Sequence, residues 1–157
     1  MVTAISFCRV FADWGFLRPM LVVVIGTHAV AALLRLVRVP LLAFLPLLLF
    51  AILELLAVVY HRDSLGYGFP TSATIDALRA DLRSVVDQFP TAVAPVPSTG
   101  PWAIGAAALL AICAAMADTF AFRAHARAET IGPAAVVFIF TAALGTEHYR
   151  VAVAVTW

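Results

Sequence analysis

Apolar runs long enough to cross a bilayer constrain this chain more than any other feature. A hydrocarbon core about 30 Å thick needs about 20 helical residues to span it. Runs near that length cover residues 17–36, 41–60 and 102–122, and a shorter run covers 131–144. Only 12% of the 157 residues are charged, too few to coat a water-soluble domain. We therefore predict an all-α polytopic membrane protein with about four transmembrane helices.

The arginines predict which side of the membrane each loop occupies. Short loops that carry arginine close to the membrane stay on the cytoplasmic side. Such loops join the first two runs, at 35–40, and the last two, at 123–127. We therefore expect a multi-pass plasma-membrane protein with residues 61–101 extracytoplasmic, although Arg9 and Arg18 lie on that same external side and oppose the assignment.

These breaks divide the chain into five expected parts. They are an N-terminal external segment (1–16), a first transmembrane hairpin (17–60), an extracytoplasmic loop (61–101), a second transmembrane hairpin (102–144) and an external turn (145–157). The final run, 151–157, is apolar but too short to cross a bilayer. We expect it to begin a further helix and the chain to be part of a longer protein.

The extracytoplasmic loop contains one amphipathic pattern, which predicts a helix over 73–89. Its apolar residues recur at helical spacing: Ile75, Leu78, Leu82, Val85, Val86 and Phe89. Thr71 or Ser72 can cap the start of this helix, and Pro90 ends it. With three aspartates against two arginines it lacks the basic face that seeks anionic lipid. We expect it to pack across the outer ends of the spans.

Three ionisable residues fall within the predicted spans: His28, Glu54 and Asp118. Intramembrane ionisable groups are candidate functional residues by default. Glu54 and Asp118 differ in depth by about 13 Å, too much to share a proton or a metal. We interpret both carboxylates as ties between helices, with Arg123 and Arg127 drawing Asp118 toward the cytoplasm. For His28 two interpretations stay open: a hydrogen bond to a neighbouring helix, or a functional role. It can contact Glu54 if the helix faces that carry the two residues pack together.

Other chemistry is not indicated by the sequence. It contains no catalytic motif of the hydrolase, metalloprotease, P-loop or dinucleotide-binding type. Cys8 and Cys113 lack metal-type spacing, and we expect neither to lie near a histidine at the same depth. A net charge of +1 without a basic cluster excludes nucleic-acid binding. We predict no catalytic residue, no cofactor and no metal site, and the lipid bilayer as the main partner.

The order of several short motifs resembles a known family. These motifs are Asp13-Trp14 before a span, the arginine turn ending at Pro40, the loop 65–71, the run 94–97, and Ala117-Asp118 before a second arginine turn. Together they resemble the N-terminal membrane region of bacterial membrane-anchored transglutaminase-like proteins of the TgpA type.

The resemblance implies an anchoring role. In that family the N-terminal helices precede an extracytoplasmic transglutaminase-like domain with a Cys-His-Asp triad. We expect no part of residues 1–157 to form such a domain, and neither Cys8 nor Cys113 is assigned to the triad. Two alternatives stay open from the residues themselves. One is a small transport or proton-handling protein that uses His28 and Glu54. The other is an accessory subunit that contacts partners through the small residues 105–108.

Overall fold

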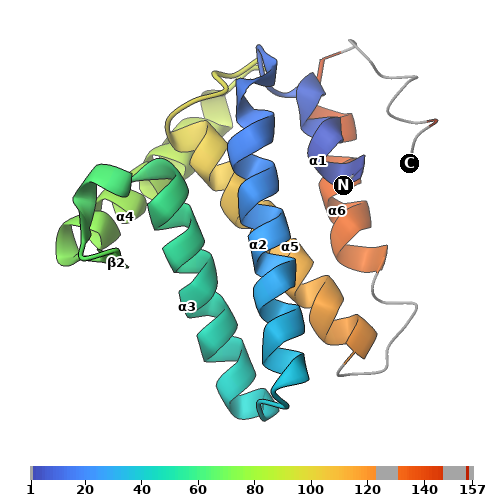
Figure 1. Cartoon of the computed structure of the whole chain (residues 1–157). Helices are drawn as coiled ribbons and strands as arrows, with labels where there is room; N and C mark the ends of the chain where they lie inside the picture. The colour runs from blue at the N-terminus through green and yellow to red at the C-terminus, as the bar shows by residue number, and fades with distance from the viewer. Residues whose placement is uncertain (1, 123–130, 147–154, 156–157) are drawn as a thin grey trace.

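The computed structural model describes residues 2–122, 131–146 and 155, which form a bundle of helices (Figure 1). Three helices are long and apolar enough to cross a membrane: α2 (Leu17–Leu36), α3 (Leu41–Tyr60) and α5 (Pro101–Phe122). Their bounds match the predicted runs to within one residue, so the all-α membrane architecture is confirmed at this level. A further apolar helix, α6 (Ile131–Leu144), forms where the fourth span was expected. It is about 21 Å long, less than the hydrocarbon core.

A tight turn joins α2 to α3. The Val39 amide donates to the Leu34 carbonyl at 3.0 Å, and Arg38 takes a positive φ of 55° to reverse the chain. Pro40 then precedes the first turn of α3. Further along, a Cβ at Gly26 would lie 2.8 Å from a methyl carbon of Leu55. The missing side chain therefore lets the two helices approach closely.

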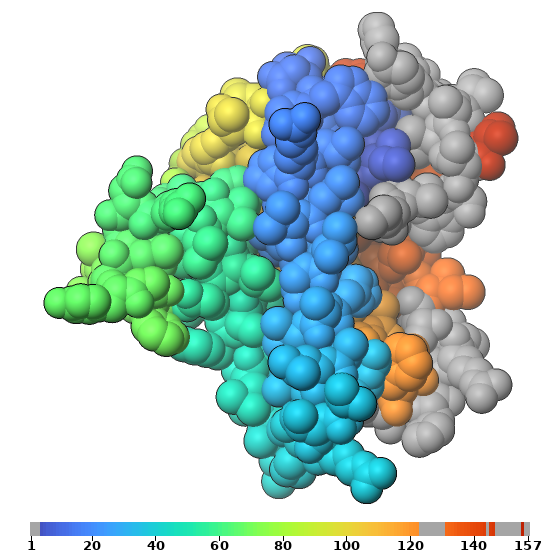
Figure 2. Space-filling model, in the orientation of Figure 1, coloured from blue at the N-terminus to red at the C-terminus, as the bar shows by residue number. Residues whose placement is uncertain are grey.

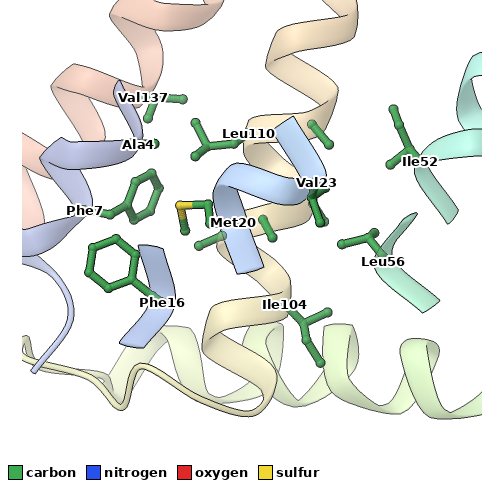
Figure 3. Close-up of a cluster of buried hydrophobic side chains, with 14 of the residues drawn as sticks. Ala4, Phe7, Phe16, Met20, Val23, Ile52, Leu56, Ile104, Leu110 and Val137 are labelled. Atoms are coloured by element: carbon green, nitrogen blue, oxygen red, sulfur yellow. The ribbon is translucent and has the colours of Figure 1, made fainter. Parts of the chain in front are cut away.

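Helix α5 lies at the centre of the bundle and contacts α2, α3, α4 and α6. Its inward side is almost entirely small, because the buried positions are dominated by alanine: Ala103, Ala106, Ala107, Ala108, Ala111 and Ala114. Small residues allow close helix packing, which is a principal source of association in lipid. Figure 3 shows larger side chains filling the core around it, with Met20 and Val23 from α2 close to Leu110 of α5.

The loop between α3 and α5 forms a layer across one end of the bundle. It contains η3 (Arg62–Ser64), a hairpin of β1 (Leu65–Gly66) and β2 (Phe69–Pro70), then α4 (Ser72–Gln88) and η4 (Phe89–Thr91). Helix α4 matches the predicted amphipathic helix, and Figure 3 shows it running across the end of α5 that carries Ile104. The sequence did not predict the hairpin, which protrudes beside α3 in the green region of Figure 2.

The N-terminal residues also fold against the bundle. They form α1 (Val2–Ser6), η1 (Phe7–Arg9) and η2 (Trp14–Phe16), and α1 lies beside α6 (Figure 1). Phe11 and Val96 form a parallel bridge that ties this segment to the loop before α5. Two of the expected features, the arginine turn at 123–127 and most of the turn and further helix at 145–157, lie outside the described residues.

Candidate functional site

Asp118 of α5 is buried, with 5% of its surface exposed, and it forms an ion pair. The partner is Arg35 near the end of α2, whose Nη1 donates to Asp118 Oδ1 at 2.5 Å. The Arg35 guanidinium also lies over the Phe122 ring, 3.8 Å from its centroid. This position combines an ion pair with a cation–π contact. The arrangement ties the ends of α2 and α5 together.

Sequence reasoning missed Arg35 as the partner of Asp118. It considered only the arginines that follow Asp118 along the chain, whereas the partner is 83 residues earlier. A usable signal was available: Arg35 and Asp118 each lie within about one turn of the same end of their predicted spans. Oppositely charged residues at equal depth in neighbouring membrane helices are expected to pair.

Glu54 of α3 has a different environment. Its side chain is half-buried, and its Oε2 atom is fully buried without a hydrogen-bond partner among the described residues. The part of the chain that the structure describes also gives it no ion pair. A carboxylate without a partner is costly to bury in its ionised form. The described residues therefore offer Glu54 Oε2 no hydrogen bond that would tie α3 to another helix.

His28 of α2 lies at the surface of the bundle and lines a small hollow of about 120 Å³. Cys113 of α5 and Val137 of α6 line the same hollow. His28 and Cys113 therefore share one hollow, a juxtaposition that the sequence did not predict. No hydrogen bond or ion pair joins His28 to Glu54 among the described residues. The three candidate residues thus occupy separate places on α2, α3 and α5.

At the opposite end of the bundle, Arg9 is buried with only 4% of its surface exposed. Its Nε donates to the Thr146 carbonyl at 2.9 Å, its Nη2 donates to the Gly145 carbonyl at 3.4 Å, and its own carbonyl accepts from the Thr146 amide at 2.8 Å. A cation is favourable at the C-terminal end of a helix, where the last carbonyls lack partners. Arg9 therefore places its charge at the C-terminal end of α6 by binding the two residues that follow the helix, and we call this arrangement the Arg9 cap.

Gly145 is part of the same cap. A Cβ at this position would lie 2.7 Å from Cβ of Arg9, which no real pair of side chains tolerates. Sequence reasoning counted Arg9 only as an external charge, because the partners that bury it are more than 130 residues away.

The layer formed by the α3–α5 loop is held by polar side chains. His61 Nε2 lies 2.7 Å from Asp81 Oδ2, which links the end of α3 to α4. The Thr71 hydroxyl caps α4 by accepting a hydrogen bond from the Thr74 amide, and the Thr74 hydroxyl accepts one from the Thr71 amide. Thr71 is therefore the cap, where the sequence had left Thr71 and Ser72 as alternatives.

Asp13 lies where the N-terminal segment meets the loop before α5. Its carboxylate accepts from the Gly15 amide at 2.7 Å and from the Ser98 hydroxyl. The hydrogen bond from the Ser98 hydroxyl, and to a smaller extent the one from the Gly15 amide, lowers the pKa of this carboxyl below its ordinary value of 3.8. Asp13 therefore stays ionised and holds the segment in place.

The described residues contain no group of three or more His, Cys, Asp or Glu side chains that could hold a metal ion. The small residues 105–108, proposed as a surface for partners, are covered within the chain: Ala106, Ala107 and Ala108 are buried, and Gly105 lies against Val85 of α4. The polar contacts described above all join parts of this chain to one another.

Comparison with protein-family models, with curated proteins and with solved structures finds no match to this chain.

Proposed function

We propose that this chain anchors an extracytoplasmic transglutaminase-like domain of the same parent protein in the bacterial plasma membrane. Three lines of support converge on this role. Three helices have the length and composition of membrane spans. The motif order resembles the membrane region of such enzymes. Several polar side chains, among them Arg9, Arg35 and His61, join helices and loops to one another, as expected of a scaffold.

The main observation that supports the proposal is that residues 61–101 form an ordered layer on one end of the bundle. The His61–Asp81 contact ties this layer to the end of α3, and the Phe11–Val96 bridge ties it to the N-terminal segment, while the Thr71 cap fixes the start of α4 within the layer. A domain carried above a membrane needs a rigid support if it is to keep a fixed position.

The orientation is tested by labelling cysteines in intact cells. In a Cys8→Ser, Cys113→Ser background, Ala80→Cys places a thiol on an exposed position of α4, and Leu36→Cys places one on the exposed turn after α2. We expect an impermeant maleimide to label the cysteine at 80 in intact cells and the one at 36 only after permeabilisation. The reverse pattern would overturn the orientation and the anchoring role with it.

The attachment itself is tested on the native protein. An antibody raised against residues 61–101 should detect, in membranes of the source organism, a polypeptide much larger than 16.7 kDa. Mass spectrometry of that band should identify transglutaminase-like sequence in the same chain. A native polypeptide of 16.7 kDa would contradict the proposal.

Proton handling is a second candidate, and the buried Oε2 of Glu54 without a described partner favours it. A membrane carboxylate without a fixed counter-charge can exchange protons when it is accessible. The test is proton flux in proteoliposomes for Glu54→Gln and His28→Gln, with Glu54→Asp as the conservative control. Anchoring predicts no flux in any sample, whereas proton handling predicts flux that both glutamine variants abolish.

A further inference from the structure

Helix α5 carries an apolar stripe on the side opposite its buried alanines. Its members follow one another at intervals of three and four residues, so they share one helix face: Trp102, Gly105, Leu109, Ile112 and Met116. The half of the stripe formed by Ile112 and Met116 is open, since Ile112 is 46% exposed and Met116 is 44% exposed. On a helix with the length and composition of a membrane span, this open half faces lipid.

Helix α4 covers the other half of the stripe, which is formed by Trp102, Gly105 and Leu109, but does not seal it. The two helices lie close together at Gly105, where a Cβ would lie 3.3 Å from a methyl carbon of Val85. Next to this contact a hollow of about 300 Å³ remains between α4, α5, α6 and the N-terminal segment. Phe89 of η4 stacks on Phe140 of α6 at 5.9 Å between ring centroids, and both rings line the hollow.

The lining of this hollow is almost entirely apolar among the described residues. Leu82, Val85 and Val86 come from α4 and Phe89 from η4, while Trp102 and Leu109 come from the α5 stripe. An apolar cavity holds no ordered water, because water there has no hydrogen-bond partners. Left empty, it forfeits the dispersion contacts of its walls. An apolar ligand is therefore the chemistry that this hollow fits.

We propose that the hollow binds one acyl chain of a bilayer phospholipid, which enters along the α5 stripe. The hollow and the open half of the stripe share the same helix face, so the binding site continues the lipid-facing surface of the span. Val86 is 70% exposed on the α4 side, which leaves the hollow open there. No charged side chain among the described residues lines it, so the site selects the hydrocarbon chain and not the headgroup. This inference rests on membrane embedding and not on the attachment of a catalytic domain.

Trp102 provides an intrinsic probe of the occupant. In a Trp14→Phe, Trp157→Phe variant, Trp102 is the only tryptophan of the chain. The purified protein in detergent is titrated with a few equivalents of phosphatidylcholine whose chains carry bromine, a short-range quencher of tryptophan fluorescence. We expect Trp102 emission to be lost, with recovery when unbrominated phosphatidylcholine is added in excess. Phosphocholine without chains should have no effect.

A matched pair of variants separates the hollow from general contact with lipid. Val86→Phe adds a larger side chain that fills the hollow from an exposed position, whereas Ala80→Phe adds the same group to an exposed position of α4 that does not line it. We expect Val86→Phe to reduce the quenching and Ala80→Phe to leave it unchanged. A second single-tryptophan variant, retaining Trp14 outside the hollow, should be quenched less than Trp102.

Quenching that is equal for Trp14 and Trp102, or that Val86→Phe does not reduce, would overturn the proposal. A second copy of the chain as the occupant would instead make Trp102 emission depend on protein concentration without added lipid, which would also overturn it. The experiment does not involve a catalytic domain. A negative result here therefore leaves the anchoring role standing, and loss of the anchoring role leaves this result standing.

Discussion

The two ends of the helical bundle are held together in different ways. At one end, the Arg35–Asp118 pair joins α2 to α5, with the Phe122 ring beneath the guanidinium. At the other end, the links are spread over the Arg9 cap, the Thr71 cap, the His61–Asp81 contact and the Phe11–Val96 bridge.

The difference follows from how much chain lies at each end. The turn between α2 and α3 is only four residues long, so it offers few backbone groups to neighbouring elements. The opposite end has 40 residues between α3 and α5, together with the N-terminal segment. More backbone there requires more hydrogen-bond partners, since buried backbone groups must be satisfied. Among the ties that the described residues make, the first end should therefore depend on the Arg35–Asp118 pair, whereas the second should tolerate the loss of any single one.

The largest effect should come from breaking the ion pair. Asp118→Ala leaves the Arg35 charge partly buried without its partner, and we expect a loss of about 2 kcal/mol, less than for a fully buried pair because Arg35 is partly exposed. Unfolding in mild detergent, followed by circular dichroism, measures this loss. Arg38→Ala, on an exposed arginine of the same turn, should cost almost nothing.

A double variant sharpens this test. Arg35→Leu combined with Asp118→Leu removes both charges, so it should recover much of the stability lost by Asp118→Ala. If the double variant is no more stable than Asp118→Ala, the ion pair is not what holds this end together.

At the opposite end, Arg9→Ala should have the next largest effect. It removes the cation from the end of α6 and leaves the Thr146 and Gly145 carbonyls unpaired, at a cost of about 1.5 kcal/mol. The same unfolding measurement applies, with Arg18→Ala as the control, since Arg18 is exposed. Equal losses for both variants would show that burial of Arg9 contributes nothing specific.

A smaller effect is expected from the α4 cap. Thr71→Ala removes the side-chain acceptor for the Thr74 amide and should lower the free energy of unfolding by about 1 kcal/mol. Ser72→Ala changes the neighbouring hydroxyl, which is exposed and caps nothing, and should change it very little. A larger loss for Ser72→Ala than for Thr71→Ala would mean that the cap is assigned to the wrong residue.

The smallest effect should be a pH dependence from Asp13. Because the folded pKa of this carboxyl is lowered by Ser98 and Gly15, it stabilises the fold above its ordinary value of 3.8, and this contribution disappears as pH falls through the folded pKa. Melting temperatures measured from pH 7 to about pH 3 should therefore fall less steeply for Asp13→Asn than for the native chain. Superimposable pH profiles for Asp13→Asn and the native chain would show that Asp13 does not stabilise this end of the bundle.

The sequence alone determined where the helices lie and what solvates them. Runs of apolar residues bounded by arginine, proline or glycine set the bounds of α2, α3 and α5, and the period of apolar residues over 73–89 predicted α4. These are local properties, because helix hydrogen bonds join residues four apart and a bilayer sets the length of a span. The same reasoning marked Asp118 and His28 as unusual, since an ionisable residue within an apolar run is visible without a structure.

Only the tertiary structure decided which residues meet. It paired Asp118 with Arg35, put Cys113 beside the same hollow as His28, buried Arg9 at the end of α6 and left Glu54 without a described partner. The physical reason is that these contacts join residues up to 137 positions apart. They depend on how each helix is rotated about its axis and how the helices cross. Periodicity identifies the apolar face of one helix, but it does not specify which neighbour that face will contact.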